Sequence, residues 1–286
     1  MKESATAVIP VAGLGTRMLP LTKALPKELL PLPVEYRGRT VLIPLLHLIL
    51  IRLYNAGIRK YVVVLSRNKE SIKNYLTPDH EYLKYLREVE GKNFEADLME
   101  EYYKMLDNIR ITYVYQLEPR GFGDAILQAK KYIEGDFIIH PGDDFIIDVE
   151  GENYIERLFK TRDKYDADIA LYIEEVTDPR HYGVIIGSKI GTNIYEVEDL
   201  VEKPEKPPSN LAITAIYLTK MDIMSEMETL KNLGAKWELV DAVRNLLRRG
   251  YKIVAVKIDN RYRIDVGRPS EYIKSIEKTL KNPIKI

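Results

Sequence analysis

Residues 8–32, VIPVAGLGTRMLPLTKALPKELLPL, join an apolar run to a loop that holds two glycines, an arginine, two lysines and several prolines. The apolar, β-branched run predicts a buried strand. The glycines allow backbone N–H groups to approach an anion, and Arg17, Lys23 and Lys27 add positive charge. This stretch therefore predicts a polyphosphate site directly after the first strand of the fold.

Two familiar nucleotide-binding patterns fail at this loop. The dinucleotide fingerprint needs a third glycine where the chain has Met18, and Pro20 and Pro26 oppose the helix that should follow. The Walker A pattern would end in Gly-Lys-Ser or Gly-Lys-Thr, which this loop lacks. A dehydrogenase is supported only by Glu35, about 20 residues after the glycines, and is disfavoured.

Short β-branched runs alternate with helical patterns along the chain. In the first part we expect strands at residues 5–12, 60–66, 109–116 and 136–142. After residue 165 we expect strands at 167–176, 182–188, 195–204 and 211–219, then a helix at 238–249, a strand at 251–257 and a helix at 269–281. This order predicts an α/β fold with a mostly parallel sheet that is covered on both faces.

The chain shows no internal repeat, low-complexity tract or linker, so we expect one domain over residues 1–286. This domain would have a first half of about residues 1–165 and a mixed second half of about residues 166–286. A charged helical insertion is expected at residues 77–108. The apolar run of residues 41–51 predicts a core helix with Pro44 in its first turn.

Composition disfavours several classes of function. Forty-three basic residues balance forty-three acidic ones, so neither nucleic acid nor a membrane is expected as a partner. The absence of cysteine excludes disulfides and cysteine-based zinc sites. We find no secretory signal pattern, and the longest apolar run is too short to cross a bilayer, so a cytoplasmic location is expected.

A second glycine-containing loop, QLEPRGFGDAI at residues 116–126, follows another predicted strand. Gln116 carries both a donor and an acceptor, so it can read the edge of a nucleobase. Gly121 allows the main chain to approach the ring. Asp124 is interpreted more simply, as a residue that caps the helix that follows.

Carboxylates follow two of the predicted strands. Asp143 and Asp144, in HPGDDFIID at residues 140–148, come directly after an apolar run, where ligands bind in open α/β sheets. Adjacent carboxylates without cysteine or histidine partners suit a hard cation such as Mg²⁺, and a tight turn is the simpler alternative. Asp265, in RIDVG at residues 263–267, is a candidate to complete the metal site from a late strand.

A further charged pair lies in LVEKPEKPPSNLAI at residues 200–213. Glu202 can bind sugar hydroxyls and Lys203 can bind a phosphate, although a solvated ion pair is the common alternative. We interpret His140 and His181 as structural residues.

Taken together, these motifs resemble a known family. AVIPVAGLGTRMLPLTKALPKELLPL, GFGDAI, YGV and VEKPEKPPSNLAI are similar, in this order, to motifs of the sugar-phosphate nucleotidylyltransferases, and most closely to the UTP:glucose-1-phosphate uridylyltransferases of bacteria and archaea. Several motifs in order are more specific than any one of them. The resemblance implies a Rossmann-like mixed, mostly parallel sheet flanked by helices, with a nucleotide-binding first half and a sugar-binding second half. Only the insertion at residues 77–108 falls outside the motifs.

The resemblance also implies roles for individual residues. The loop that holds the nucleotide matches Ala12, Gly13, Gly15 and Thr16, and the base-reading positions match Gln116 and Gly121. The residues implied in catalysis are Arg17 on the triphosphate, Lys27 facing the departing pyrophosphate, and Asp143 and Asp265 as the Mg²⁺ ligands. The sugar phosphate is implied at Lys203 and the hexose at Gly183, Glu202 and Tyr217. Asp144 is the weaker metal candidate of its pair.

The chain departs from the family pattern at Ile43, at Ala215 and at residues 235–237, where relatives often carry lysine, glycine and acidic residues respectively. These departures concern the sugar pocket and the subunit contacts more than the chemistry.

The implied reaction is in-line attack by the phosphate of glucose 1-phosphate on the α-phosphorus of UTP, giving UDP-glucose and pyrophosphate with Mg²⁺ as cofactor. The attacking phosphate needs no general base, because its second pKa is about 6. A thymidylyltransferase that uses dTTP and a non-catalytic nucleotide-sugar sensor are the alternatives. Family members are often homo-oligomers, and the same is expected here.

Overall fold

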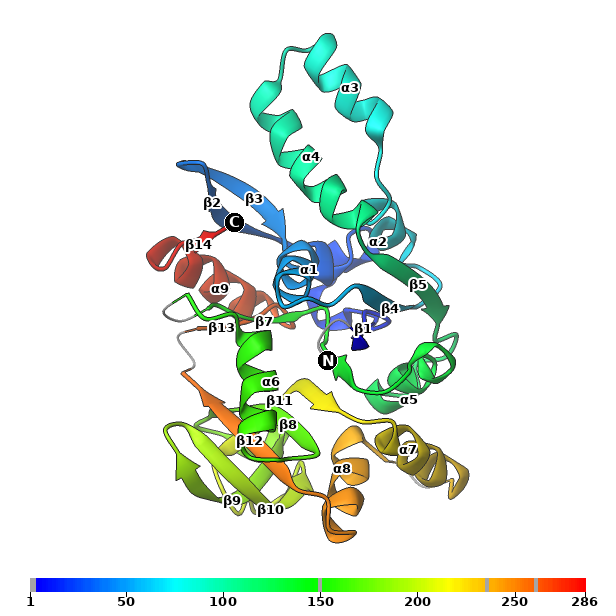
Figure 1. Cartoon of the computed structure of the whole chain (residues 1–286), viewed down its shortest axis with the longest axis vertical. Coiled ribbons are helices and arrows are strands. Elements are labelled where there is room, and N and C mark those ends of the chain that lie inside the picture. Colours follow the sequence, from blue (N-terminus) through cyan, green and yellow to red (C-terminus); the bar gives the residue numbers. More distant parts are fainter. Residues whose placement is uncertain (1–3, 149–150, 235–236, 260–261) are drawn as a thin grey trace.

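The fold is built on a nine-stranded sheet that starts from the strand in the opening stretch (Figure 1). The computed structural model describes residues 4–148, 151–234, 237–259 and 262–286. Along the sheet the strand order is β5-β4-β1-β6-β11-β8-β12-β10-β9.

The first half of the chain supplies a parallel part of the sheet. Its strands are β1 (Thr6–Pro10), β4 (Lys60–Leu65), β5 (Arg110–Tyr115) and β6 (Phe137–Ile139). β1 lies between β4 and β6, and β4 lies between β1 and β5, with every pairing parallel. The four strands predicted in this half are confirmed, and their carboxyl ends share one edge of the sheet.

The second half of the chain makes the sheet mixed. Its strands are β8 (Ile169–Glu175), β9 (Gly183–Gly191), β10 (Ile194–Glu202), β11 (Leu211–Thr219) and β12 (Ile253–Ile258). β12 is parallel to β8, whereas β11 is antiparallel to β6, β8 and β9, and β10 is antiparallel to β9 and β12. The prediction of a mostly parallel sheet is therefore not confirmed. Short connections such as residues 192–193 between β9 and β10 leave no room for a crossover helix and favour antiparallel pairing.

Helices cover both faces of the sheet, because its strands are apolar on both sides. On one face Ala7 and Ile9 of β1 pack in a core with α1 (Leu45–Asn55) and α6 (Tyr154–Lys164). On the other face Val8 packs in a second core with helices of both halves of the chain. These helices are α5 (Phe122–Leu127), α7 (Asp222–Asn232) and α8 (Leu239–Arg248).

The predicted start of the core helix at residue 41 is wrong. Residues 41–44 belong to β3 (Arg39–Pro44), which pairs with β2 (Pro31–Tyr36) in a separate three-stranded sheet completed by β14 (Ile284–Lys285). The helix begins only at Leu45, because proline restricts the residue before it to an extended conformation.

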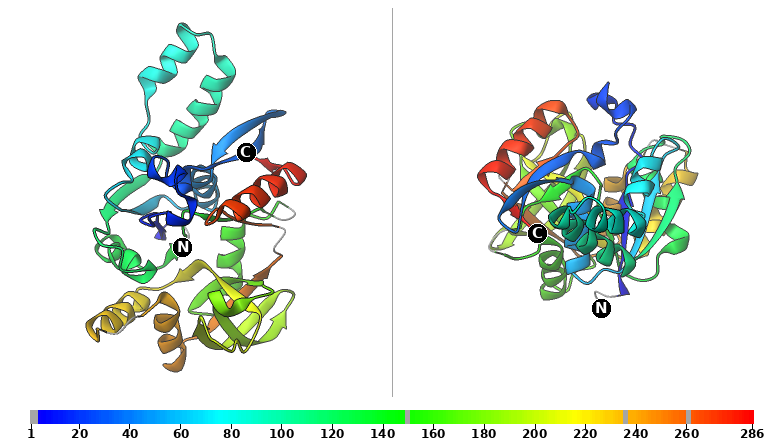
Figure 2. Two further views of the ribbon diagram at one scale, coloured as in Figure 1. Left: turned by 180° about the vertical axis from the view of Figure 1, so that it is seen from behind. Right: turned by 90° about the horizontal axis from the view of Figure 1, so that it is seen from above.

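The insertion forms a helical arm that projects from the sheet (Figures 1 and 2). After the short α2 (Glu70–Tyr75), the arm consists of α3 (His80–Glu88) and α4 (Asn93–Asp107), so the predicted helical character of residues 77–108 is confirmed. At its base the ring of Tyr102 stacks on His47 with a centroid distance of 3.8 Å. Burial in this aromatic cluster lowers the pKa of His47 to about 3.

A short two-stranded sheet joins distant parts of the chain. β7 (Asp144–Ile146) pairs antiparallel with β13 (Arg263–Asp265), so that Asp265 lies opposite Asp144. The N–H of Val266 donates to the carbonyl of Asp143 at 3.2 Å. α9 (Pro269–Lys281) follows β13 and packs against it.

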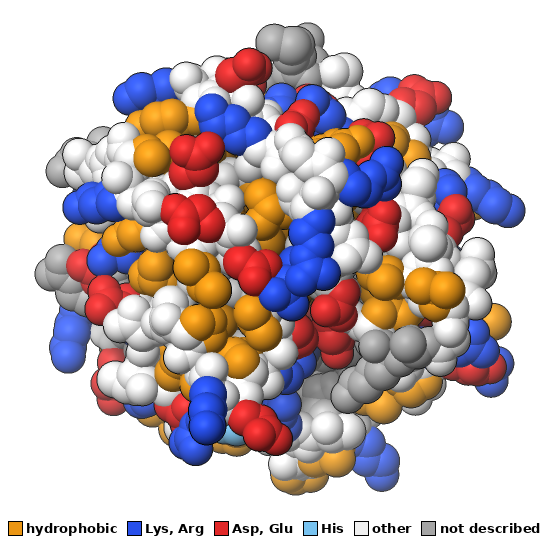
Figure 3. All heavy atoms as spheres, turned by 90° about the horizontal axis from the view of Figure 1, so that it is seen from below, with side chains coloured by type: hydrophobic (Ala, Val, Ile, Leu, Met, Phe, Trp, Pro, Cys, Tyr) orange, Lys and Arg blue, Asp and Glu red, His pale blue; other side chains and the backbone are white. Residues whose placement is uncertain are grey.

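The surface carries no large region of one charge on the face shown in Figure 3, where basic and acidic side chains are intermixed. None of the helices in the described part of the chain combines the length and the apolar character needed to cross a membrane.

Candidate active site

The glycine loop after β1 is an ordered series of short 3-10 turns at Thr16–Met18, Leu21–Lys23 and Lys27–Leu29. Gly15 has φ 65°, in the left-handed region, and its carbonyl accepts a 2.8 Å hydrogen bond from the Thr22 hydroxyl. A Cβ on Gly15 would lie only 3.0 Å from Cγ2 of Thr22. The fold therefore requires glycine at this position.

Lys27 projects from the last turn of this loop onto the first carboxylate. Its ammonium forms an ion pair with Asp143, and both side chains are largely covered. Burial lowers the pKa of Lys27, but the charge and hydrogen bond of Asp143, together with the charges of Glu28 and Asp265, offset this, and the pKa ends above its usual value. Lys27 is therefore a cation at neutral pH. Gly13 lies beside this side chain, because a Cβ on Gly13 would lie 3.9 Å from Cε of Lys27.

The loop is anchored by a buried ion pair beneath it. Glu28 is 1% exposed, and one of its carboxylate oxygens lies 2.6 Å from Nζ of Lys69. Burial raises the pKa of Glu28, and Lys69 opposes that rise.

A cluster of carboxylates surrounds Arg263, whose side chain is largely covered. Arg263 donates to Asp144 from Nε at 3.0 Å and from Nη2 at 2.8 Å, and it also pairs with Glu174. Nη2 lies 3.8 Å from Asp265. Since Asp144 is fully engaged with Arg263, the structure supports its interpretation as the weaker metal candidate.

Asp143 and Asp265 face the same cleft, as the sequence predicted. Burial raises the pKa of Asp265, and the neighbouring negative charges of Asp144 and Asp143 raise it further. The N–H of Gly267 donates to Oδ1 of Asp265 at 2.6 Å. A cation between these carboxylates would relieve their repulsion, although no cluster of three or more metal-ligating side chains occurs in the part of the chain that the structure describes.

Gln116 lies at the end of β5 and is 7% exposed. Its amide nitrogen donates to the carbonyl of Gly121 at 3.0 Å and to Asp124 at 2.9 Å. Gly121 has φ 106°, a conformation that favours glycine. The structure thus joins the two predicted base-reading residues through the amide of Gln116.

The interpretation of Asp124 as a helix cap is wrong. The residue that precedes α5 is Gly121, and Asp124 lies within the first turn of the helix, where it accepts from Gln116 and pairs with Lys231 of α7 at 2.8 Å. Burial raises the pKa of Asp124, but Lys231 and Gln116 lower it by more, so the carboxylate is ionised. Sequence reasoning missed this role because Lys231 is 107 residues away.

Trp237 covers the start of α5. A Cβ on Gly123 would lie 2.3 Å from the indole of Trp237, so only glycine fits beneath the ring. The two residues before it, Ala235 and Lys236, which also depart from the family pattern, lie outside the described residues.

The predicted sugar-binding residues gather on β9, β10 and β11. Gly183 pairs with Glu202, and a Cβ on Gly183 would lie 2.9 Å from the carboxylate of Glu202. Nζ of Lys203 lies 2.5 Å from Glu202 and 3.9 Å from Glu238, which precedes α8. Tyr217 is buried on β11, where burial and the charge of Glu202 raise its pKa, so its hydroxyl stays protonated.

One cleft of about 820 Å³ brings together the charged residues of both halves. Five predicted residues line it: Arg17, Lys27, Asp143, Lys203 and Asp265. The other predicted residues are not part of its lining: Ala12, Gly13, Gly15, Thr16, Gln116, Gly121, Gly183, Glu202 and Tyr217. Arg17 approaches Lys203 closely enough to oppose its positive charge.

The chain is similar to known proteins in both sequence and structure. A family model described as nucleotidyl transferase matches residues 6–282. This chain belongs to the nucleotidyl transferase family. Two of its relatives are UTP–glucose-1-phosphate uridylyltransferases. That of Staphylococcus epidermidis is 34% identical over 99% of this chain and 95% of its own, and that of Streptococcus pneumoniae is 35% identical over 97% of this chain and 91% of its own.

Solved structures of nucleotidyl transferase relatives have the same fold. A UDP-glucose pyrophosphorylase complexed with UDP-glucose has a TM-score of 0.78 at 28% identity, covering 97% of this chain and 98% of its own. A UTP-bound UGPase from Acinetobacter baumannii has a TM-score of 0.81 at 27% identity, covering 98% and 94%. A further structure, from Bacillus anthracis at 18% identity, shows likeness of fold alone.

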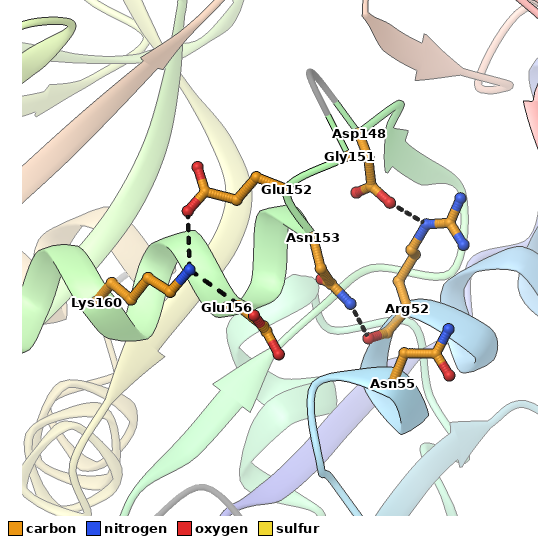
Figure 4. A pocket seen from close by; sticks show the side chains of 8 residues that line it. All are labelled: Arg52, Asn55, Asp148, Gly151, Glu152, Asn153, Glu156 and Lys160. Atoms are coloured by element: carbon orange, nitrogen blue, oxygen red, sulfur yellow. Dashed lines mark hydrogen bonds and ion pairs between the residues drawn. The ribbon is translucent and has the colours of Figure 1, made fainter.

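A second hollow of about 500 Å³ lies apart from the charged cleft of this nucleotidyl transferase (Figure 4). Its charged side chains pair with one another: Arg52 with Asp148 at 2.6 Å, and Lys160 with Glu152 at 3.1 Å and Glu156 at 3.9 Å. None of the predicted site residues lines it.

Sequence reasoning also missed Arg263 and Glu174, which hold the carboxylate cluster. Both lie within or at the end of strands, where charged side chains are usually solvent-facing. The one local signal in the sequence was that each of these charged residues lies close to the end of a strand, Arg263 in β13 and Glu174 in β8.

Proposed function

We propose that this protein transfers the uridylyl group of UTP to glucose 1-phosphate, giving UDP-glucose and pyrophosphate. The observation that carries the proposal is the cleft in which Arg17, Lys27 and Asp143 of the first half face Lys203 and Asp265 of the second. The cleft places fixed charges around the space where two phosphate-bearing substrates would meet. The relatives named above as UTP–glucose-1-phosphate uridylyltransferases support this choice of substrates.

In the proposed step, an oxygen of the sugar phosphate forms a bond to the α-phosphorus of UTP. The bond between that phosphorus and the oxygen that bridges to the β-phosphate breaks, and pyrophosphate leaves with the electron pair. The protein supplies alignment and charge neutralisation, since the nucleophile is already an anion at neutral pH. Arg17 and Lys27 would stabilise the charge that develops on pyrophosphate.

The cleft residues fit a divalent cation. Asp143 and Asp265 lie in one cleft, where burial and the negative charges of Asp144 and Asp143 raise the pKa of Asp265. A cation between the carboxylates would relieve this repulsion. Mg²⁺ is usually held by one or two protein carboxylates and completes its shell with phosphates and water. When bound, it would supply charge neutralisation between the two substrates.

The remaining roles follow the same division of the molecule. Gln116 and Gly121 would bind the base, and the loop of Ala12, Gly13, Gly15 and Thr16 the nucleotide phosphates. Lys203 would bind the sugar phosphate, and Gly183, Glu202 and Tyr217 the hexose. Lys27 is paired with Asp143 in this structure, so it must leave that carboxylate to reach a phosphate.

The test is pyrophosphate release in the presence of Mg²⁺ and glucose 1-phosphate, with UTP, dTTP, ATP, CTP and GTP compared in parallel. We expect turnover led by UTP and abolished in Asp143→Asn. Turnover led by dTTP would assign the neighbouring thymidylyltransferase activity, and no turnover by folded protein would contradict the proposal.

We further propose that the two halves of residues 1–286 work as one domain around this cleft. The single domain, a homo-oligomeric assembly and a cytoplasmic location stay predictions of the sequence. Gel filtration with light scattering would test the oligomeric state.

A further inference from the structure

The amide of Gln116 is held in one orientation. Nε2 lies 3.0 Å from the carbonyl oxygen of Gly121 and 2.9 Å from Oδ2 of Asp124. A carbonyl and an ionised carboxylate accept hydrogen bonds and cannot donate them, so the amino group must face both. No hydrogen bond joins Oε1 of Gln116 to the described residues. The amino group is therefore already engaged, and the acceptor Oε1 is the part of the side-chain amide left for a ligand.

Asp124 is fixed on its other side. Nζ of Lys231 lies 2.8 Å from Oδ1, and the residue is 5% exposed. With one oxygen bound to an ammonium and the other to the amide of Gln116, the carboxylate cannot rotate without losing both contacts. A separate ion pair, Lys130 with Glu228, already joins this region to α7. Among the described residues, the ion pair of Asp124 with Lys231 is thus one of two charged links between this part of the chain and α7.

We propose that Asp124 sets the nucleobase preference of the site. By holding the amide of Gln116 with its oxygen outward, it selects a pyrimidine that carries N–H at ring position 3, as uracil and thymine do. Cytosine presents an acceptor at this position, and two facing acceptors repel. Asp124 is a positioning residue, because it acts on the base through Gln116. The inference rests on the proposed function, in which Gln116 faces the base.

The substitution Asp124→Asn isolates this role. Lys231 would keep the carboxamide oxygen, which leaves the Asn amino group to face Gln116. Two amino groups cannot satisfy one another, so the Gly121 carbonyl alone would favour the present orientation and the Gln116 amide becomes freer to turn its own amino group toward the base. An outward-facing donor would accept cytosine, and the preference for UTP over CTP would fall.

The experiment compares kcat/KM for UTP and for CTP in wild type, Asp124→Asn and Glu228→Gln. The last variant is a matched control, because it makes the same chemical change on α7 at a charge pair that does not touch Gln116. We expect the UTP-to-CTP ratio to fall about tenfold or more in Asp124→Asn and to stay unchanged in Glu228→Gln. A fall in both rates with an unchanged ratio would overturn the inference, because a merely structural residue affects both nucleotides alike.

Equilibrium binding separates this inference from the proposed reaction. Trp237 is the only tryptophan of the chain and packs on Gly123, so its fluorescence can follow UTP and CTP binding without sugar phosphate. A wild-type protein that binds UTP over CTP but releases no pyrophosphate would contradict the reaction and still allow the ratio to be measured. If Asp124→Asn does not fold, Lys231→Met, which leaves the carboxylate unanchored, should lower the binding ratio in the same direction. An unchanged ratio in that variant would overturn the inference.

Discussion

Arg17 is exposed at the cleft and forms no hydrogen bond or ion pair with the other described residues. Its charge is therefore available to a substrate, and its removal should not disturb the fold. We expect Arg17→Ala to reduce kcat about 10²–10³-fold, because a preorganised donor to the developing charge is lost. Its thermal unfolding midpoint should match that of wild type. Arg110→Ala, an exposed arginine on β5, is the control and should retain full activity, whereas more than half of the wild-type rate in Arg17→Ala would contradict the assignment.

The buried ion pair of Glu28 and Lys69 should contribute to the stability of the folded protein. Lys69→Met would leave Glu28 charged and unpaired in the core and should lower the free energy of unfolding by about 3–5 kcal/mol. Because burial then raises the pKa of Glu28 without the opposing charge and hydrogen bond of Lys69, that pKa rises further and the loss of stability should shrink as the pH falls. Urea unfolding at several pH values measures this. The double variant Lys69→Met/Glu28→Leu should recover much of the loss, and a single variant as stable as wild type would contradict the prediction.

At this scale the sequence predicted which charged residues meet in the cleft only where the signal is local, and their roles stay predictions. Lys27, Asp143 and Asp265 follow strands or glycines, and strand ends in α/β sheets meet at one edge. Asp124 and Arg263 were not predicted as site residues, since their partners lie 107 and 119 residues away. Such pairings are decided by the strand order, which spacing along the chain does not reveal.

Among the elements, α8 is tied to β10 by a two-point contact. Arg244 donates to Asp199 from Nε at 2.7 Å and from Nη2 at 2.6 Å, and this contact lowers the pKa of Asp199. A lowered pKa adds stability above the unfolded value of about 3.9, and this stability is lost as the pH falls through the folded value.

We therefore expect Arg244→Met to unfold more easily than wild type at pH 7, with a difference that narrows below about pH 4. Thermal unfolding monitored by circular dichroism across this range is the measurement. Arg248→Met, an exposed arginine on the same helix that acts on Asp199 only weakly and through its charge, should show a much smaller change at either pH. A difference that grows as the pH falls would contradict the assignment.

Element types were predictable where the pattern was long and regular. The predicted β-branched strands correspond to β1, β4, β5, β6 and β11, and the charged segment at residues 77–108 contains α3 and α4. β2 with β3, and β7 with β13, were not predicted, since short strands packed at the side of a sheet carry little periodicity. The antiparallel position of β11 was also missed, because sheet order is a property of tertiary packing.

At the scale of the whole molecule, the charged cleft draws its residues from both halves. A nucleotide that contacts both should stabilise the folded state by about 2.7 kcal/mol at a concentration 100 times its dissociation constant. We expect this to raise the unfolding midpoint by about 5–10 °C with UTP and by less with CTP at the same concentration. Differential scanning fluorimetry measures both, and equal shifts for the two nucleotides would contradict the proposed base selection.

The position of β11 in the sheet has a consequence for folding during synthesis on the ribosome. β6, which ends at Ile139, pairs with β1 on one side and with β11 on the other. Until Thr219 has left the exit tunnel, the nascent first half carries an open strand edge whose backbone groups can pair with another chain. Nascent chains stalled between these two points should therefore depend on chaperones, and those stalled beyond Thr219 should depend on them less.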